Sequence, residues 1–194
     1  MTTIESKRRK IGGPLALLTV TAVLFGPVQP GARADVVDSA AGGFTVKVTV
    51  NIHAAPAEVY RRLVNNIGDW WNPAHTFSGD AHNLSIDDRP NGCLCEKLPN
   101  GGSVRHLEVI YVQPGKLLRM TGGLGPLQSL AVAGVATFTI APEADGTRLE
   151  LTYSVGGYSA GGLNFLSQPV DMVLTEQMKR LKNYVETGKA GAEK

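Results

Sequence analysis

Residues 167–188 read SQPVDMVLTEQMKRLKNYVETG, a stretch whose spacing predicts a long helix with one face to bury. Ser167 is a suitable N-cap, Pro169 fits the first turn, and Gly188 supplies the stop. Apolar residues and one glutamine recur every three or four positions and form one stripe. The stripe consists of Val170, Val173, Leu174, Gln177, Leu181 and Val185. The rest of the fold must therefore cover this stripe.

The preceding chain begins with a strand and a helix. Residues 44–52, FTVKVTVNI, alternate apolar and polar side chains, which predicts a half-buried strand. Pro56 then suits the first turn of a helix. The apolar residues that follow, at spacings of four, four and three, extend this amphipathic helix for about four turns, to a point near Pro73. They are Val59, Leu63, Ile67 and Trp70.

Six further short apolar runs are separated by turn-forming residues, and short turns between consecutive strands imply antiparallel pairing. The runs span residues 84–86, 93–98, 104–112, 117–121, 134–141 and 148–156. We expect an α+β fold in which a curved antiparallel sheet of about seven strands surrounds the C-terminal helix. A flat two-layer sandwich is the alternative, and the glycine pairs at 122–123 and 156–157 favour bends.

The N-terminus has the pattern of a secretory signal peptide. Basic residues 7–10 precede an apolar run of about a dozen residues, which is too short to span a bilayer, and a small-residue site at 32–34 follows. We expect cleavage after Ala34 and a periplasmic or secreted protein. The expected organisation is a signal peptide at 1–34, a short linker at 35–43, one domain at 44–188 and a polar tail at 189–194.

The charge of the mature chain gives no indication of a polyanionic partner. Residues 1–34 hold five of the 19 Lys and Arg residues and one of the 17 Asp and Glu residues, which leaves 14 basic and 16 acidic residues and a net charge of −2. We therefore expect no nucleic-acid partner and no stable membrane anchor after cleavage.

Cys93 and Cys95 are the two cysteines of the chain. A labile disulfide between them is one alternative, but residues two apart on an extended strand lie at the far edge of the distance that a disulfide bridges. We expect two buried thiols acting as small apolar residues. Zinc sites normally space paired cysteines by two to four residues, so we expect no metal, and no cofactor motif is present.

Long segments of the chain resemble bacterial members of the SRPBCC superfamily, which is also described as START-like or polyketide cyclase/dehydrase-like. The segments are WWNPAHTFSGDAHNLSID (70–87), RPNGCLCEKLPNGGSVRHLEVIYVQPGKLLRMTGGLGPLQ (89–128), GTRLELTYSVGGY (146–158) and EQMKRLKNYVE (176–186). The resemblance implies the helix-grip fold, with an apolar cavity between sheet and helix. It does not imply one activity, because the superfamily includes lipid carriers, hormone receptors, cyclases, hydroxylase domains and chaperone ATPase activators.

Aromatic and apolar residues on the expected cavity wall are candidates for ligand binding. They are Trp70, Trp71, His75, Phe77, Tyr111, Met120, Phe138, Tyr153 and Val173. The segment from Trp70 to Phe77 is either the mouth of the cavity, with His75 as a polar anchor, or a packed helix end.

Glu96, His106 and His75 are the candidate catalytic residues. If His106 faces the cavity beside Glu96 of the preceding strand, the two form a general acid/base pair. Strict alternation instead places His106 with Glu108 and Ile110 on the solvent face, because Leu107 and Val109 are more apolar. The alternation favours this second arrangement.

These observations favour an exported protein that binds or carries a small hydrophobic or amphipathic ligand. The alternative is a cavity enzyme of the cyclase, dehydratase or isomerase type that uses a His/Glu pair. A third class, a module that regulates a chaperone ATPase, fits export poorly because the periplasm has no ATP pool.

Overall fold

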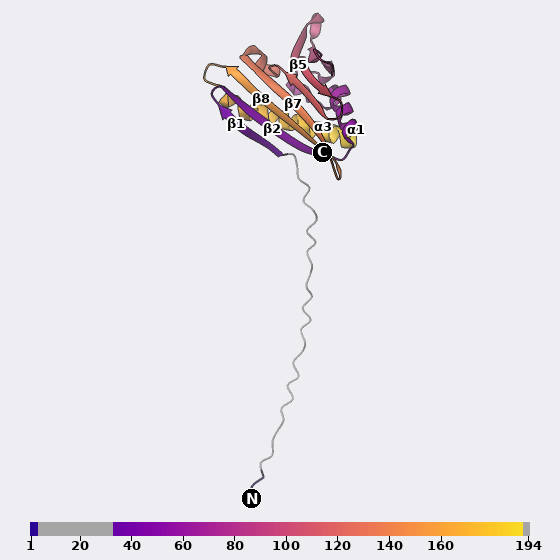
Figure 1. Ribbon diagram of the computed structural model, residues 1–194, viewed down its shortest axis with the longest axis vertical. Helices are drawn as coiled ribbons and strands as arrows, with labels where there is room; N and C mark the ends of the chain where they lie inside the picture. Colours follow the sequence, from indigo (N-terminus) through magenta and orange to yellow (C-terminus); the bar gives the residue numbers. More distant parts are fainter. Residues whose placement is uncertain (4–32, 192–194) are drawn as a thin grey trace.

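The computed structural model describes residues 1–3 and 33–191, and within these residues eight strands form one antiparallel sheet. The sheet curves around the long helix α3 (Ser167–Thr187), as Figure 1 shows. The strand order is β1-β2-β8-β7-β6-β5-β4-β3. The strands are β1 (Arg33–Ala40), β2 (Gly43–Ile52), β3 (Leu84–Ile86), β4 (Cys93–Lys97), β5 (Ser103–Gln113), β6 (Leu117–Thr121), β7 (Ala131–Glu143) and β8 (Gly146–Tyr158). The predicted α+β helix-grip fold is confirmed, with eight strands in place of about seven.

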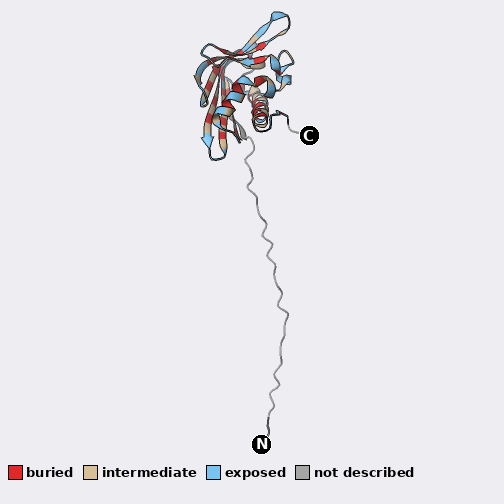
Figure 2. Ribbon diagram, turned by 90° about the vertical axis from the view of Figure 1, so that its right-hand side faces the viewer, coloured by how far each residue is buried: buried red, intermediate tan, exposed pale blue. Residues whose placement is uncertain are grey.

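The core lies between the sheet and α3, which packs mainly against β2 and β1. Buried and less buried residues alternate along β2 without interruption, as the sequence pattern predicts. Figure 2 shows bands of buried residues along the strands and the helices. The buried residues of β2 are Phe44, Val46, Val48, Val50 and Ile52. Their burial against α3 stabilises the fold through the hydrophobic effect.

The additional strand is β1, which occupies most of the segment that we expected to be a linker at 35–43. It pairs with β2 in antiparallel register, and the register shifts between Val36 and Asp38. The period-two pattern ends at this irregularity, because Val36 is half-buried whereas residues 37–40 are all exposed. The signal-peptide prediction falls mainly on residues 4–32, outside the described residues, and cleavage after Ala34 would leave six of the eight residues of β1.

The first helix is interrupted, whereas we predicted a continuous one. Helix α1 (Pro56–Asn65) ends at Asn66, whose φ of −122° is not helical, and the short helix α2 (Ile67–Trp70) follows. The Asn66 side chain donates a hydrogen bond to the Asp69 carboxylate, and Asn is a poor helix former. Gly68 also approaches His82 so closely that a Cβ atom would lie 2.9 Å from it.

Helix α3 begins and ends close to the predicted residues, although its N-terminus is capped differently. The 3-10 turn η5 (Asn164–Leu166) leads directly into the helix, so Leu166 is the N-cap and Ser167 is already helical. The Ser167 hydroxyl donates to the carbonyl of Asn164. Gly188 ends the helix in the left-handed conformation, as predicted.

Candidate functional site

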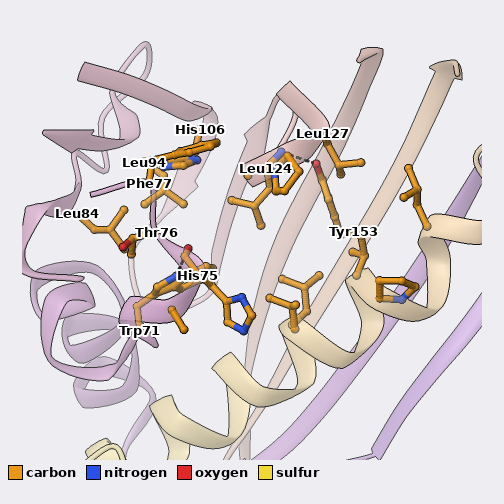
Figure 3. A pocket seen from close by; sticks show the side chains of 18 residues that line it. Trp71, His75, Thr76, Phe77, Leu84, Leu94, His106, Leu124, Leu127 and Tyr153 are labelled. Atoms are coloured by element: carbon orange, nitrogen blue, oxygen red, sulfur yellow. Dashed lines mark hydrogen bonds between the residues drawn. The ribbon is translucent and has the colours of Figure 1, made fainter. Parts of the chain in front are cut away.

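A cavity of about 300 Å³ lies between the first half of α3, the segment 71–77 and the sheet (Figure 3). Apolar side chains make up most of its wall, and two histidines, one threonine and one tyrosine provide the polar side chains. The lining residues are Trp71, Ala74, His75, Thr76, Phe77, Leu84, Leu94, His106, Leu124, Gly125, Pro126, Leu127, Tyr153, Leu166, Pro169, Val170, Val173 and Leu174.

Five of the nine residues expected to bind a ligand line this cavity: Trp71, His75, Phe77, Tyr153 and Val173. Three others, Trp70, Met120 and Phe138, line a second cavity of about 20 Å³, which has little more room than a water molecule needs. These three are core residues behind the main cavity, and each is at least 93% buried.

Tyr111, the ninth candidate, lies outside the cavity. Its side chain is 48% exposed, and the Arg119 guanidinium lies 5.8 Å from the centre of its ring. The register of β5 and β6 shifts between Val109 and Tyr111, so Ile110 is an extra residue that turns Tyr111 outward, and the next residue, Val112, packs against the core. The prediction placed Tyr111 on the cavity wall because it assumed an unbroken period of two.

Glu96 and His106 form a buried pair in the wall of the cavity. The Nε2 atom of His106 lies 2.9 Å from Oε2 of Glu96. Glu96 is 1% exposed and His106 is 4% exposed. Their side chains come from the adjacent strands β4 and β5, and His106 contributes directly to the cavity surface. Of the two alternatives, the structure therefore has the one in which His106 faces the cavity beside Glu96.

A β-bulge explains why strict alternation placed His106 on the solvent face. Leu94 pairs with Leu107 and Cys95 pairs with Arg105, so His106 is the extra residue of β5. As a result, His106 and Leu107 are both buried although they are consecutive. No residue type in this stretch of sequence marks the bulge.

The carboxylate of Glu96 has two further partners, which are backbone N–H groups. Phe77 N–H donates to Oε2 at 3.1 Å and Ser78 N–H donates to Oε1. Burial raises the pKa of Glu96, but the hydrogen bonds that its carboxylate accepts outweigh this effect, and the net pKa lies below the usual 4.5. Glu96 is therefore ionised at neutral pH, and it fastens the segment 77–78 to β4.

His106 has one polar atom without a partner. Its Nδ1 atom is buried and has no hydrogen-bond partner among the described residues. The ring of Phe77 stacks on the imidazole, with centroids 5.7 Å apart and planes inclined by 9°. Figure 3 shows the two rings together at one end of the cavity. The stacking and the bond to Glu96 fix the orientation of the imidazole.

Cys93 and Cys95 form a disulfide, so the prediction of two free thiols is wrong. Their Cα atoms are 5.3 Å apart, closer than the roughly 6.6 Å spanned by two residues of a regular strand. The contraction coincides with the register shift opposite His106. Leu94, between the two cysteines, lines the cavity, and both cysteines are half-buried.

The segment that carries His75 is attached to α3. The Nε2 atom of His75 lies 3.2 Å from a carboxylate oxygen of Glu176, and the side-chain amide of Asn72 donates to the other oxygen. The N–H group of Asn72 donates to Gln177. His75 is thus a partly exposed residue of the cavity rim, about 33% accessible, and it is not brought together with Glu96.

Tyr153 of β8 is hydrogen-bonded to the segment that follows β6. Its hydroxyl donates to the carbonyl of Gly122 at 2.9 Å and accepts from the N–H of Leu124 at 3.0 Å. Burial raises the pKa of Tyr153 to about 12. Gly134 makes room for the ring, because a Cβ atom there would lie 2.5 Å from a ring carbon. Tyr153 therefore holds the segment 122–124, which leads into the cavity-lining residues 124–127.

Residues 43–186 match the family model described as polyketide cyclase / dehydrase and lipid transport. The chain belongs to this family. The description fits a domain that binds a ligand in its cavity, and the family implies that the ligand is small and hydrophobic. No curated protein is significantly similar to the chain.

Solved structures with the same fold share little sequence with this family member. A conserved protein of unknown function from Enterococcus faecalis, EF2215, is 18% identical, with a TM-score of 0.57 over 84% of this chain and 81% of that one. Protein CV1439 from Chromobacterium violaceum is 19% identical, with a TM-score of 0.52 over 73% and 96%. Protein Ms6760 from Mycobacterium smegmatis is 19% identical, with a TM-score of 0.50 over 82% and 100%. These likenesses support the fold.

Residues 1–3 and 33–191 contain neither a membrane-spanning helix nor a metal-binding cluster. None of the helices there is long and apolar enough to cross a bilayer. No group of three or more His, Cys, Asp or Glu side chains in those residues is arranged to hold a metal ion.

Proposed function

We propose that this protein binds and carries a small hydrophobic or amphipathic molecule in the main cavity. The observation that carries the proposal is the cavity itself, about 300 Å³ of space walled mainly by apolar side chains between α3 and the sheet. Concave apolar sites with a few polar groups are typical of small-molecule binding. A core that served only for stability would be packed without space of this size.

The volume supports a small occupant. Ligand-binding pockets commonly measure about 300–1,000 Å³, so this cavity is at the lower end of that range. A molecule of one or two rings, or a single short acyl chain, suits this space better than a lipid with two chains. The two histidines of the wall lie apart from each other: His106 is buried beside Glu96, and His75 is at the rim.

An enzyme that uses the same cavity is the second candidate, and the Glu96–His106 pair favours it. A histidine held 2.9 Å from a buried carboxylate is a suitable general acid or base. Such an enzyme would convert its ligand, whereas a carrier would release it unchanged. Mass analysis of the extracted ligand before and after incubation with the protein distinguishes the two.

We further propose that the protein acts after export, in the periplasm or outside the cell, and that the N-terminal residues are removed. The support is the order of basic residues, short apolar run and small-residue site in 7–34. N-terminal sequencing of the protein from a periplasmic fraction tests this proposal. A chain that begins at Asp35 is expected, and an intact N-terminus in the cytoplasmic fraction would contradict it.

The binding proposal is tested with a fluorescent apolar probe, N-phenyl-1-naphthylamine, and two variants of α3. Val173 lines the cavity, whereas Met172, the preceding residue, is 68% exposed. Val173→Trp fills the cavity and is expected to weaken probe binding by at least tenfold. Met172→Trp adds an indole to the surface of the same helix and should bind like the wild type. Equal binding by all three proteins would show that the cavity is not the site.

A further inference from the structure

One residue in the wall of the main cavity has a buried polar atom without a hydrogen-bond partner. Six side-chain atoms in the described part of the chain are buried without a hydrogen-bond partner, and His106 is the only residue among their owners that lines the main cavity. Burying a polar group without a partner is costly, so the arrangement around such an atom calls for an explanation. A hydrogen bond from a ligand in the cavity would remove this cost at Nδ1 of His106.

The partners of Glu96 determine the chemical character of this atom. The carboxylate of Glu96 accepts from Nε2 of His106 and from two backbone N–H groups, and an ionised carboxylate has no proton to donate. The proton of a neutral imidazole must then lie on Nε2, which leaves a lone pair on Nδ1. In this neutral form Nδ1 is an acceptor, and its complement is a donor.

We propose that Nδ1 of His106 accepts a hydrogen bond from a hydroxyl, phenol or amide N–H group of the bound molecule, and that Glu96 is a positioning residue that fixes the tautomer. The proposal rests on the proposed function, because it assigns the polar end of the ligand in the same cavity. It narrows the ligand class to small amphipathic molecules that carry a hydrogen-bond donor on an otherwise apolar body.

Other polar groups of the wall do not compete for this role. The hydroxyl of Tyr153 already donates once and accepts once, and the indole N–H of Trp71 donates to the carbonyl of His75. The hydroxyl of Thr76 donates to the carbonyl of Pro73. His75 is paired with Glu176 at the rim.

The test compares 2-naphthol with 2-methoxynaphthalene, which has the same ring system but a methyl ether in place of the hydroxyl donor. Their dissociation constants are measured by calorimetry for the wild type, for His106→Phe and for His82→Phe. The ratio of the two constants is compared between proteins, so that the difference in hydrophobicity of the probes cancels. Phenylalanine keeps the ring that stacks on Phe77 and removes both nitrogens. His82 is exposed and outside the cavity, so His82→Phe is the matched control.

We expect the preference for 2-naphthol to fall about tenfold in His106→Phe, which corresponds to about 1.4 kcal/mol, and to be unchanged in His82→Phe. An unchanged ratio in His106→Phe, with both probes bound, would overturn this inference and leave the proposed function intact. Failure of the wild type to bind either probe would overturn both.

A second measurement does not depend on how His106→Phe folds. The chain has four histidines, so their ring nitrogens can be assigned by ¹⁵N NMR. His106 is expected to carry its proton on Nε2, and the Nδ1 resonance should move when 2-naphthol is added but not when 2-methoxynaphthalene is added. A proton on Nδ1 in the free protein, or equal responses to the two probes, would contradict the proposal.

Discussion

Replacing Tyr153 with phenylalanine removes one oxygen atom that two backbone groups use. The hydroxyl donates to Gly122 and accepts from Leu124, and the side chain is 1% exposed. Each buried group left without a partner costs about 1–3 kcal/mol. Gly122 and Leu124 are half-buried, so water can replace part of the loss. We therefore expect Tyr153→Phe to lower the free energy of unfolding by about 2 kcal/mol.

Urea unfolding followed by circular dichroism measures this loss, and a domain of this size should melt about 4–8 °C lower. Tyr158→Phe is the control, since Tyr158 is 72% exposed on the same strand and should change stability by less than about 0.5 kcal/mol. Because the freed segment leads into the cavity-lining residues 124–127, probe binding should also weaken. A Tyr153→Phe protein as stable as the wild type would refute the claim that the hydroxyl fastens this wall.

Three further predictions concern Glu96, the disulfide and Gly134. The pKa of Glu96 is lower in the folded than in the unfolded protein. The ionised carboxylate therefore contributes fully to stability above about pH 4.5, and this contribution is lost as the pH falls through the folded pKa. When unfolding is measured from pH 7 to pH 3, the free energy of unfolding should fall less steeply in Glu96→Gln than in the wild type. The disulfide between Cys93 and Cys95 closes only a short loop, so its reduction should lower the free energy of unfolding by about 1.5 kcal/mol. Urea unfolding with and without a thiol reductant measures this loss, and a double Cys→Ala variant should not respond to the reductant. Gly134→Ala places a Cβ atom against the Tyr153 ring and should destabilise the protein by about 1–3 kcal/mol in thermal melts, and a neutral effect would contradict the tight packing.

The fold could be predicted from periodicity because its main elements are regular. The period of two in 44–52 and the helical stripe in 167–188 each correspond to an element whose apolar side is buried. Turn residues between the short strands also indicated antiparallel pairing correctly. These features depend on local spacing, which a single sequence displays directly.

The site was less predictable because it depends on departures from regular spacing. One extra residue at His106 turned its side chain into the cavity, and another at Ile110 turned Tyr111 out of it. The shortened strand between Cys93 and Cys95 allowed a disulfide that an ideal strand would disfavour. Each of these departures depends on how a strand pairs with its neighbour, and the sequence of one strand does not show that pairing.

The central claim is that the cavity holds a small hydrophobic or amphipathic molecule, and native mass spectrometry of protein purified from its own host tests it most directly. We predict one bound molecule per chain, which organic extraction releases as a small compound with a hydrogen-bond donor, and a much lower occupancy in Val173→Trp than in Met172→Trp. A wild-type protein that is empty, and whose melting temperature ignores a panel of small hydrophobic compounds, would contradict the claim.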